Sequence, residues 1–301
     1  RPEPHPATLT LNGTLALAGR DRPLSASGFD GRLRLMDGSL DQFRPYGEAF
    51  GFSTAAGRLD LSVTGRGTLD RFDVRAEAAV AALNVSWPAV FPRPLTPAIV
   101  RVRGHLTRAP EQWALETARV EIDRLRLEGG FRLHALDTRD PILSAHVSIP
   151  RLTLAEAKPY IPFGLLSRDT GDFIRDHLRQ ATFSAATGRL QGRLSQIRRM
   201  DRGDNARALA VRSHVTAGIL TFGPDIPLFE DVAGQIRLEG TDVLFEGMTG
   251  RIGTSPFRLD GRITDYPLDA PSRYPFAATL NPGPREVQWL LGEAGGKLQH
   301  S

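Results

Sequence analysis

The feature that most constrains this chain is the alternation of apolar and polar residues along most of its 301 positions. In Arg32–Leu35 leucine alternates with arginine, and Leu59–Val63 and Val100–Arg103 continue the pattern. Successive side chains of a β-strand point to opposite faces of a sheet, so this alternation gives each strand one apolar and one polar face. The sequence therefore predicts a mainly β protein built from amphipathic antiparallel strands.

Further strands follow the same pattern, and most of them are bounded by Gly, Pro, Asn or Asp, which favour turns. Within Val120–Leu133 the phase of the alternation changes, which predicts a bulge at Asp123-Arg124 and a turn at Gly129-Gly130. The additional strands are expected at Ile142–Ile149, Thr182–Leu194, Ala206–Phe222, Gly234–Glu239, Val243–Ile252, Phe257–Thr264 and Pro275–Leu280.

Helical periodicity is confined to two short segments. Thr170–Gln180 is expected to be helical, because Phe173, Ile174, His177 and Leu178 recur at helical spacing. A second helix is expected to begin near Pro284, whose fixed φ suits a first turn. Neither segment is long enough to form a second layer over a sheet.

A degenerate internal repeat relates Pro94–Leu133 to Pro227–Thr264. In each copy a strand is expected to end at a glycine, Gly104 or Gly240, before a second alternating strand and a third that contains Gly129 or Gly261. A structural unit that occurs twice indicates that the sheet is extended by adding similar units along the chain. The predicted division is an N-terminal β segment (1–157), a helical linker (158–189), a second β segment (190–284) and a short helix with a tail (285–301).

Composition excludes several classes of function. The chain has no cysteine, which rules out disulfides, zinc-thiolate sites and cysteine nucleophiles. Its basic residues are nearly all arginines interleaved with Asp and Glu, which favours a solvated mixed-charge face over a nucleic-acid interface. The seven histidines are scattered, and the glycines of Gly250–Phe257 lack the lysine and helix of a phosphate loop, which favours a turn there. No catalytic residue, metal site or cofactor is predicted.

The segment Lys158–Tyr266 resembles a known family. It contains a Tyr-x-Pro entry at Tyr160, strands marked by Gly188 and Gly192, a turn around Gly223–Pro227, and the motif Asp-Val-x-Gly-x-Ile that begins at Asp231. In this order these features resemble the AsmA-like proteins of Gram-negative bacteria, especially the YhdP type. The N-terminal half agrees with that family in style only.

The resemblance implies a bridge-like lipid carrier without catalytic residues. The family's fold is an elongated, curved antiparallel sheet that forms an apolar groove, with one or two short helices. Its expected function is to carry phospholipid acyl chains through the periplasm between the inner and outer membranes, anchored to the inner membrane by parts outside this chain. The abrupt, proline-rich start at Arg1 leads us to expect a segment of a longer protein.

The candidate lipid contacts are the apolar positions of the alternating strands. Periodicity alone favours an alternative, in which these positions form the dry core of a β-sandwich, and it is the resemblance that favours lipid. The predicted lipid-binding residues are Val100, Val102, Leu115, Val120, Ile122, Leu125, Leu127, Phe131, Leu133, Ile236, Leu238, Phe245, Ile252, Phe257, Leu259 and Ile263.

Two other functions remain open at the level of sequence. One is a structural or binding β module of the cell envelope, such as an outer-membrane assembly scaffold or an adhesin. The other is a β-sandwich enzyme that acts on polysaccharide. Aromatic residues make up only 7% of the chain, with three tryptophans, which argues against the stacking platforms that sugar binding uses. The resemblance favours the lipid carrier, with the envelope module as the alternative.

Overall fold

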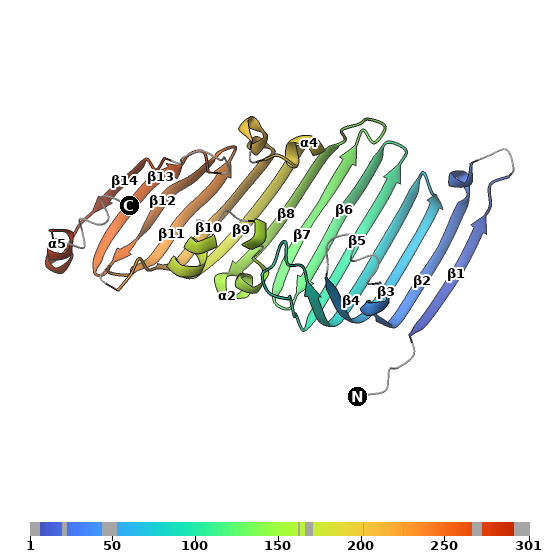
Figure 1. Ribbon diagram of the computed structural model, residues 1–301, viewed down its shortest axis with the longest axis horizontal. Coiled ribbons are helices and arrows are strands. Elements are labelled where there is room, and N and C mark those ends of the chain that lie inside the picture. The colour runs from blue at the N-terminus through green and yellow to red at the C-terminus, as the bar shows by residue number, and fades with distance from the viewer. Residues whose placement is uncertain are drawn as a thin grey trace. The chain divides into compact units, whose positions relative to one another are not determined.

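The structure, a computed structural model, describes residues 7–19, 23–43, 53–161, 163–165, 171–200, 202–224, 226–266 and 273–291. It is mainly β, as predicted: one open antiparallel sheet of 14 strands whose spatial order equals their order in the chain (Figure 1). The strands are β1 (Thr8–Ala16), β2 (Gly28–Ser39), β3 (Thr54–Thr68), β4 (Phe72–Ser86), β5 (Ile99–Ala109), β6 (Gln112–Ile122), β7 (Leu125–His134), β8 (Ile142–Thr153), β9 (Leu178–Arg193), β10 (Leu209–Leu220), β11 (Phe229–Glu239), β12 (Asp242–Ile252), β13 (Ser255–Ile263) and β14 (Phe276–Leu280).

The described helices are short and lie between or after the strands. The α-helices are α2 (Leu154–Ala157), α4 (Leu194–Ile197) and α5 (Pro284–Leu291). The 3-10 turns are η1 (Leu24–Ala26), η2 (Leu40–Phe43), η3 (Lys158–Tyr160), η4 (Phe163–Leu165) and η6 (Gly203–Ala208), and η5 (Phe173–His177) is a π-helical turn.

The chain divides into two compact units. Unit 1 comprises Arg1–Ser148, Pro159–Leu165 and Leu190–Ser195, and it contains β1 to β7 with most of β8. Unit 2 comprises Ile149–Lys158, Leu166–Arg189 and Gln196–Ser301, and it contains β10 to β14 with most of β9. The segment 158–189, predicted as a linker, therefore contributes residues to both units.

All seven additional strands predicted from the alternation are present as β8 to β14, and α5 is the predicted second helix. The expected helix Thr170–Gln180 is wrong in its last three residues: Phe173–His177 form the π-helical turn η5, Leu178–Gln180 belong to β9, and Thr170 lies outside the described residues. Strand pairing overrides the helical spacing here. The backbone N–H of Thr221 donates to the carbonyl oxygen of His177, and the side-chain Nε2 of Gln180 donates to the backbone carbonyl oxygen of Ala217.

The bulge predicted at Asp123-Arg124 and the turn predicted at Gly129-Gly130 are both wrong. Asp123-Arg124 is the tight turn between β6 and β7, and Asp123 has a φ of 51°. Gly129-Gly130 lies inside β7, and the register shift is in β6 between Leu115 and Ala118. Gly104 likewise lies inside β5 rather than at its end. The two copies of the predicted repeat correspond to the strands β5–β7 and β11–β13.

Carboxylates stabilise the irregular positions of several strands. At the bulge in β2, the backbone N–H of Asp37 donates to Oδ1 of Asp60 on β3 over 2.9 Å. At the bulge in β12, the N–H of Gly247 donates to Oδ1 of Asp260 on β13 over 2.6 Å. A bulge leaves a backbone group outside the ladder, and these side chains satisfy it while the strand bends.

A buried carboxylate fastens α5 to the turn between β12 and β13 in unit 2. Glu286 is only 4% exposed, and its Oε1 accepts hydrogen bonds from the backbone N–H and the hydroxyl of Thr254. The backbone N–H of Gly283 donates to Oγ of Ser255 over 2.8 Å. The hydrogen bond from the backbone of Thr254 is the main cause that lowers the pKa of Glu286 below its usual 4.5.

Docking of α5 is therefore expected to depend on pH. A lowered folded-state pKa means that ionised Glu286 stabilises the folded form above 4.5, and that this contribution is lost as the pH falls through the lowered pKa. Hydrogen exchange of the α5 amides is expected to accelerate in that acidic range. In Glu286→Gln the α5 amides should exchange faster already at neutral pH, and their exchange should lose most of its dependence on the protonation of residue 286. Equal acid dependence in both proteins would contradict this role of Glu286.

Candidate functional site

The cross-strand register of unit 1 collects its apolar residues on one side of the sheet. Residues paired across neighbouring strands share a face, and pairs such as Leu33 with Val63 and Val102 with Val120 join apolar with apolar. We call this set the apolar face of unit 1. It consists of Leu9, Leu11, Gly13, Leu15, Phe29, Gly31, Leu33, Leu35, Leu59, Leu61, Val63, Gly65, Gly67, Phe72, Val74, Ala76, Ala78, Val80, Val100, Val102, Gly104, Leu106, Arg108, Trp113, Leu115, Ala118, Val120, Ile122, Leu125, Leu127, Gly129, Phe131, Leu133, Leu143, Ala145 and Val147.

The opposite side of the same strands carries the charged residues. Arg119 on β6 pairs with Glu128 on β7 at 3.0 Å, and Arg103 on β5 approaches Glu77 on β4 at 3.8 Å. These side chains are at least half exposed, so each pair contributes little to stability. Their effect is to keep this side hydrophilic, which leaves the apolar face as the side that must be covered.

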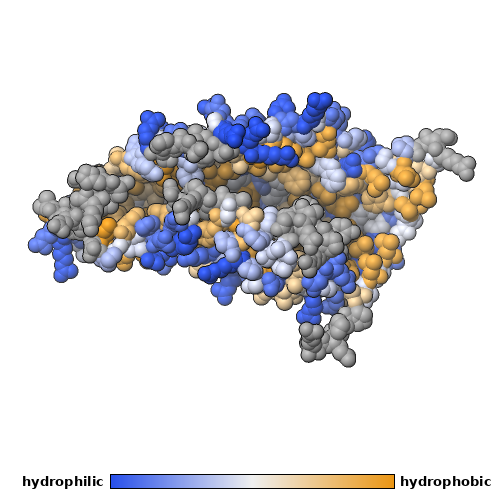
Figure 2. All heavy atoms as spheres, in the orientation of Figure 1, coloured by the Kyte–Doolittle hydropathy of each residue, from blue (hydrophilic) through white to orange (hydrophobic). Residues whose placement is uncertain are grey.

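In unit 1 the apolar face is not sealed by the described residues. Leu9 is 64% exposed, Leu11 is 73% exposed and Val102, in the middle of the sheet, is 38% exposed. Of its large side chains only Leu125 is buried. Figure 2 shows hydrophobic side chains gathered in the middle of the visible surface and hydrophilic ones toward its rims. A dry sandwich core would have buried these residues instead.

Glycines on the apolar face allow neighbouring backbones to approach one another on that side. A Cβ on Gly31 would lie 2.8 Å from the carbonyl oxygen of Asn12, and one on Gly13 would meet the backbone of Asp30. A Cβ on Gly129 would collide with the backbone of His146. Substitution by alanine would force the strands apart, so these positions let the sheet bend toward its apolar side.

Unit 2 has a corresponding apolar face without any charged residue among its paired positions. Its exposed members are Val211 at 38%, Phe276 at 41% and Ala278. The face consists of Val211, Ser213, Val215, Gly218, Leu220, Phe229, Val232, Gly234, Ile236, Leu238, Val243, Phe245, Met248, Gly250, Ile252, Ser255, Phe257, Leu259, Gly261, Ile263, Phe276, Ala278 and Leu280.

Part of the unit 2 face is a dry cluster. Val232, Met248, Ile252 and Phe257 are each at most 9% exposed and pack together. Phe257 lies over Gly250, where a Cβ would come within 2.7 Å of its ring, and Met248 covers Gly234 in the same way. The side chains of one strand thus fill the space above glycines of the next, and no room remains there for a ligand.

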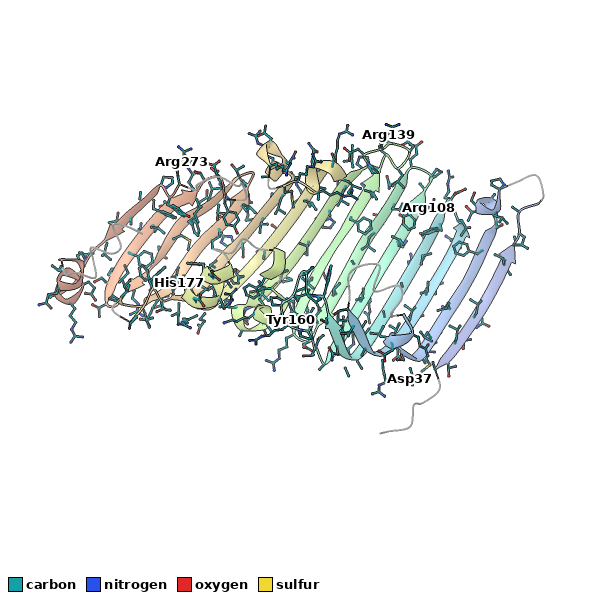
Figure 3. All side chains as sticks on the ribbon, in the orientation of Figure 1. Asp37, Arg108, Arg139, Tyr160, His177 and Arg273 are labelled. Atoms are coloured by element: carbon teal, nitrogen blue, oxygen red, sulfur yellow. The ribbon has the colours of Figure 1, made fainter. Side chains whose placement is uncertain are left out.

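An aromatic row extends from this cluster. The ring of Phe257 contacts that of Phe229 edge-on, Phe229 contacts Phe222, and Phe222 stacks on His177 at 5.2 Å. The Nδ1 of His177 lies 2.8 Å from the carbonyl oxygen of Thr221, and its ring approaches Phe173 of η5 (Figure 3). The row places η5 against the strand ends of unit 2.

All 16 residues predicted to contact lipid lie on an apolar face, nine in unit 1 and seven in unit 2. Ile252 and Phe257 belong to the dry cluster, and Leu125 is buried as well. The prediction omitted β1 to β4, although Leu33, Leu61 and their neighbours carry the same alternation. It also omitted Arg108, whose position in the alternation of β5 places it on the apolar face.

In unit 1 a tyrosine holds the segment Pro159–Leu165 at the ends of β6 and β7. The hydroxyl of Tyr160 donates to Oδ2 of Asp123 over 2.9 Å, and Oδ1 of Asp123 accepts from the backbone N–H of Ile99. Burial, followed by the hydrogen bond and the negative charge of Asp123, raises the pKa of Tyr160 to about 12. The N–H of Gly164 donates to the carbonyl of Val90, which ties the same segment to the β4–β5 connection.

The part of the chain that the structure describes contains no group of His, Asp and Glu residues suited to hold a metal ion. No helix within that part is long and apolar enough to cross a membrane. No family model matches the chain. Neither a curated protein nor a solved structure matches it significantly. The apolar faces are therefore the candidate functional site.

Proposed function

We propose that this chain is a non-enzymatic segment of an AsmA-like protein that binds phospholipid acyl chains on its apolar faces. In this proposal the parent protein is periplasmic, is anchored to the inner membrane outside this chain, and passes lipid between the inner and outer membranes. The resemblance of Lys158–Tyr266 to that family supports the cellular setting. The chemistry is supported by the faces described above.

The observation that carries the proposal is the half-exposed apolar face of unit 1. It extends over eight strands and contains a single charged residue, and of its large side chains only Leu125 is buried by the described part of the chain. Soluble proteins rarely expose an apolar surface this continuous unless it binds a partner. Hydrocarbon chains suit it, because they need no hydrogen bonds and the face offers almost none.

The energetics favour acyl chains as the cover. Each methylene group removed from water contributes about 0.8 kcal/mol, so the two chains of a phospholipid gain well over about 10 kcal/mol in gross terms. The face repeats Leu, Val, Ala and Gly from strand to strand. A lipid therefore meets similar surface at each strand, which suits movement along the sheet.

Lipid analysis of the purified chain tests the proposal. The protein is purified without detergent from a Gram-negative host, extracted, and its lipid quantified by mass spectrometry against protein. We expect co-purified phospholipid at about one molecule or more per chain, and uptake of a fluorescent phospholipid by the delipidated protein. Absence of both would overturn the proposal and favour the structural or binding module of the envelope.

A further inference from the structure

Arg108 is an exception on the apolar face of unit 1. It is the only charged residue among the paired positions of that face in the described strands, and it lies between Phe72 of β4 and Trp113 of β6. Figure 3 places it at the strand ends opposite to those near Tyr160. A charge on an otherwise apolar surface costs free energy unless a partner compensates it, so the contacts of this side chain are informative.

Aromatic rings and one carbonyl hold the guanidinium in place. Its carbon lies 5.2 Å from the ring centroid of Trp113, a distance at which a cation–π interaction is favourable. Phe72 supports Trp113 edge-on at 5.4 Å. The Nη1 group donates to the carbonyl oxygen of Leu69 over 2.6 Å. These contacts hold the guanidinium group of Arg108 at the boundary between the apolar face and solvent.

Most of the donors of Arg108 remain unused. A guanidinium carries five N–H groups, and the structure gives Arg108 one hydrogen bond. Its Nε is buried and has no hydrogen-bond partner among the described residues. The nearest carboxylate oxygen, Oδ1 of Asp70, is 3.9 Å from Nη2, too far for a hydrogen bond. A buried donor without a partner is rare in folded proteins and points to a missing acceptor.

We propose that Arg108 binds the phosphate group of an anionic amphiphile whose acyl chains lie on the apolar face of unit 1. Phosphate oxygens match the planar fork of arginine and accept from two donors at once. The adjoining residues of the face, Leu106 and Leu133 among them, provide the surface for the chains. This inference rests on the proposed function and adds to it a headgroup chemistry and a position.

Asp70 provides a second test of the inference, because removing its charge should strengthen lipid binding. Its carboxylate is about half exposed and competes with a phosphate for the same cation. Asp70→Asn removes this competition and retains a side chain of similar size. The variant should bind the phosphate-bearing lipid more tightly, whereas a purely structural role of the Arg108–Asp70 pair predicts weaker binding or no change.

The test compares two lipids with the same fluorescent acyl chain, phosphatidic acid and diacylglycerol, which differ only in the phosphate. Arg108→Gln in the full chain is expected to weaken phosphatidic acid binding about tenfold, the magnitude of one charge-assisted hydrogen bond, and to leave diacylglycerol binding within about twofold. Arg103→Gln is the matched control, because it removes the same charge from the same strand on the opposite face. Arg108→Lys should show an intermediate loss.

The outcomes separate the two proposals. If the unaltered chain binds neither lipid, the proposed function fails; if Arg108→Gln binds both lipids as the unaltered chain does, only the role of Arg108 fails. Inorganic phosphate, added as competitor, distinguishes a headgroup from a free anion: displacement of phosphatidic acid at millimolar phosphate would indicate a phosphate site independent of lipid. If Arg108→Gln does not fold, tighter phosphatidic acid binding by Asp70→Asn supports the inference and unchanged binding overturns it.

Discussion

Val120→Asp is expected to reduce phospholipid loading at least tenfold while the protein still folds. Val120 lies between Val102 of β5 and Leu127 of β7, in the middle of the apolar face of unit 1. Acyl chains over this position would bury an unpaired carboxylate, which costs several kcal/mol even after partial relaxation. Without lipid, the carboxylate can reach water because Val120 is only partly buried. Loading is measured as lipid per protein by mass spectrometry.

A matched variant separates the effect of position from that of charge. Thr117→Asp places the same charge on the same strand, but Thr117 is exposed and pairs with His105 on the polar side. It is expected to load lipid normally. If Val120→Asp also loads normally, the face is not the lipid site. If it fails to fold while Thr117→Asp folds, the face is a dry core and the proposed function is wrong.

Phe257→Ala is expected to lower the free energy of unfolding of unit 2 by about 3–5 kcal/mol, the usual cost of truncating a buried phenylalanine. Phe257 is 9% exposed, packs with Val232, Met248 and Ile252, and contacts the ring of Phe229 at 5.8 Å. Its removal leaves a cavity above Gly250, over which the Phe257 ring lies. Urea unfolding combined with hydrogen exchange of β11 to β13 measures the loss.

Val102→Ala in unit 1 provides the contrast. Val102 is 38% exposed on its apolar face, so the same kind of truncation is expected to cost under about 1 kcal/mol in delipidated protein. Equal losses in the two variants would contradict the distinction between a dry cluster in unit 2 and an uncovered face in unit 1. A small loss in Phe257→Ala with reduced lipid loading would return Phe257 to the lipid contacts predicted from sequence.

The sequence predicts the faces well because alternation is a local property. The period of two within each strand is enough to predict that Val100, Val102 and Val120 lie on its apolar side. In the structure these residues pair with apolar residues of the neighbouring strands. The alternation does not say which apolar positions are covered. Ile252 and Phe257 have the same pattern as Val120, and only the packing of Met248 and its neighbours distinguishes them.

The errors also have physical causes. A two-residue turn places Ile122 and Leu125 opposite each other, which in the sequence resembles a bulge. Leu178 satisfies a helical stripe, yet β9 takes it because pairing fixes more hydrogen bonds than a single helical turn. The position of Arg108 could have been predicted from the sequence. Extending the alternation of β5 past Gly104 places Arg108 on the apolar face, whereas a strand that is assumed to end at Gly104 does not include Arg108.

The strand order has a consequence for how the chain folds. Each described strand pairs only with the strands before and after it in sequence, so nearly every backbone contact closes a short loop. Such a topology has a low relative contact order for an all-β protein, and folding is expected to spread from any early hairpin to its neighbours. Synthesis on the ribosome suits this route, because each emerging strand finds its partner already present.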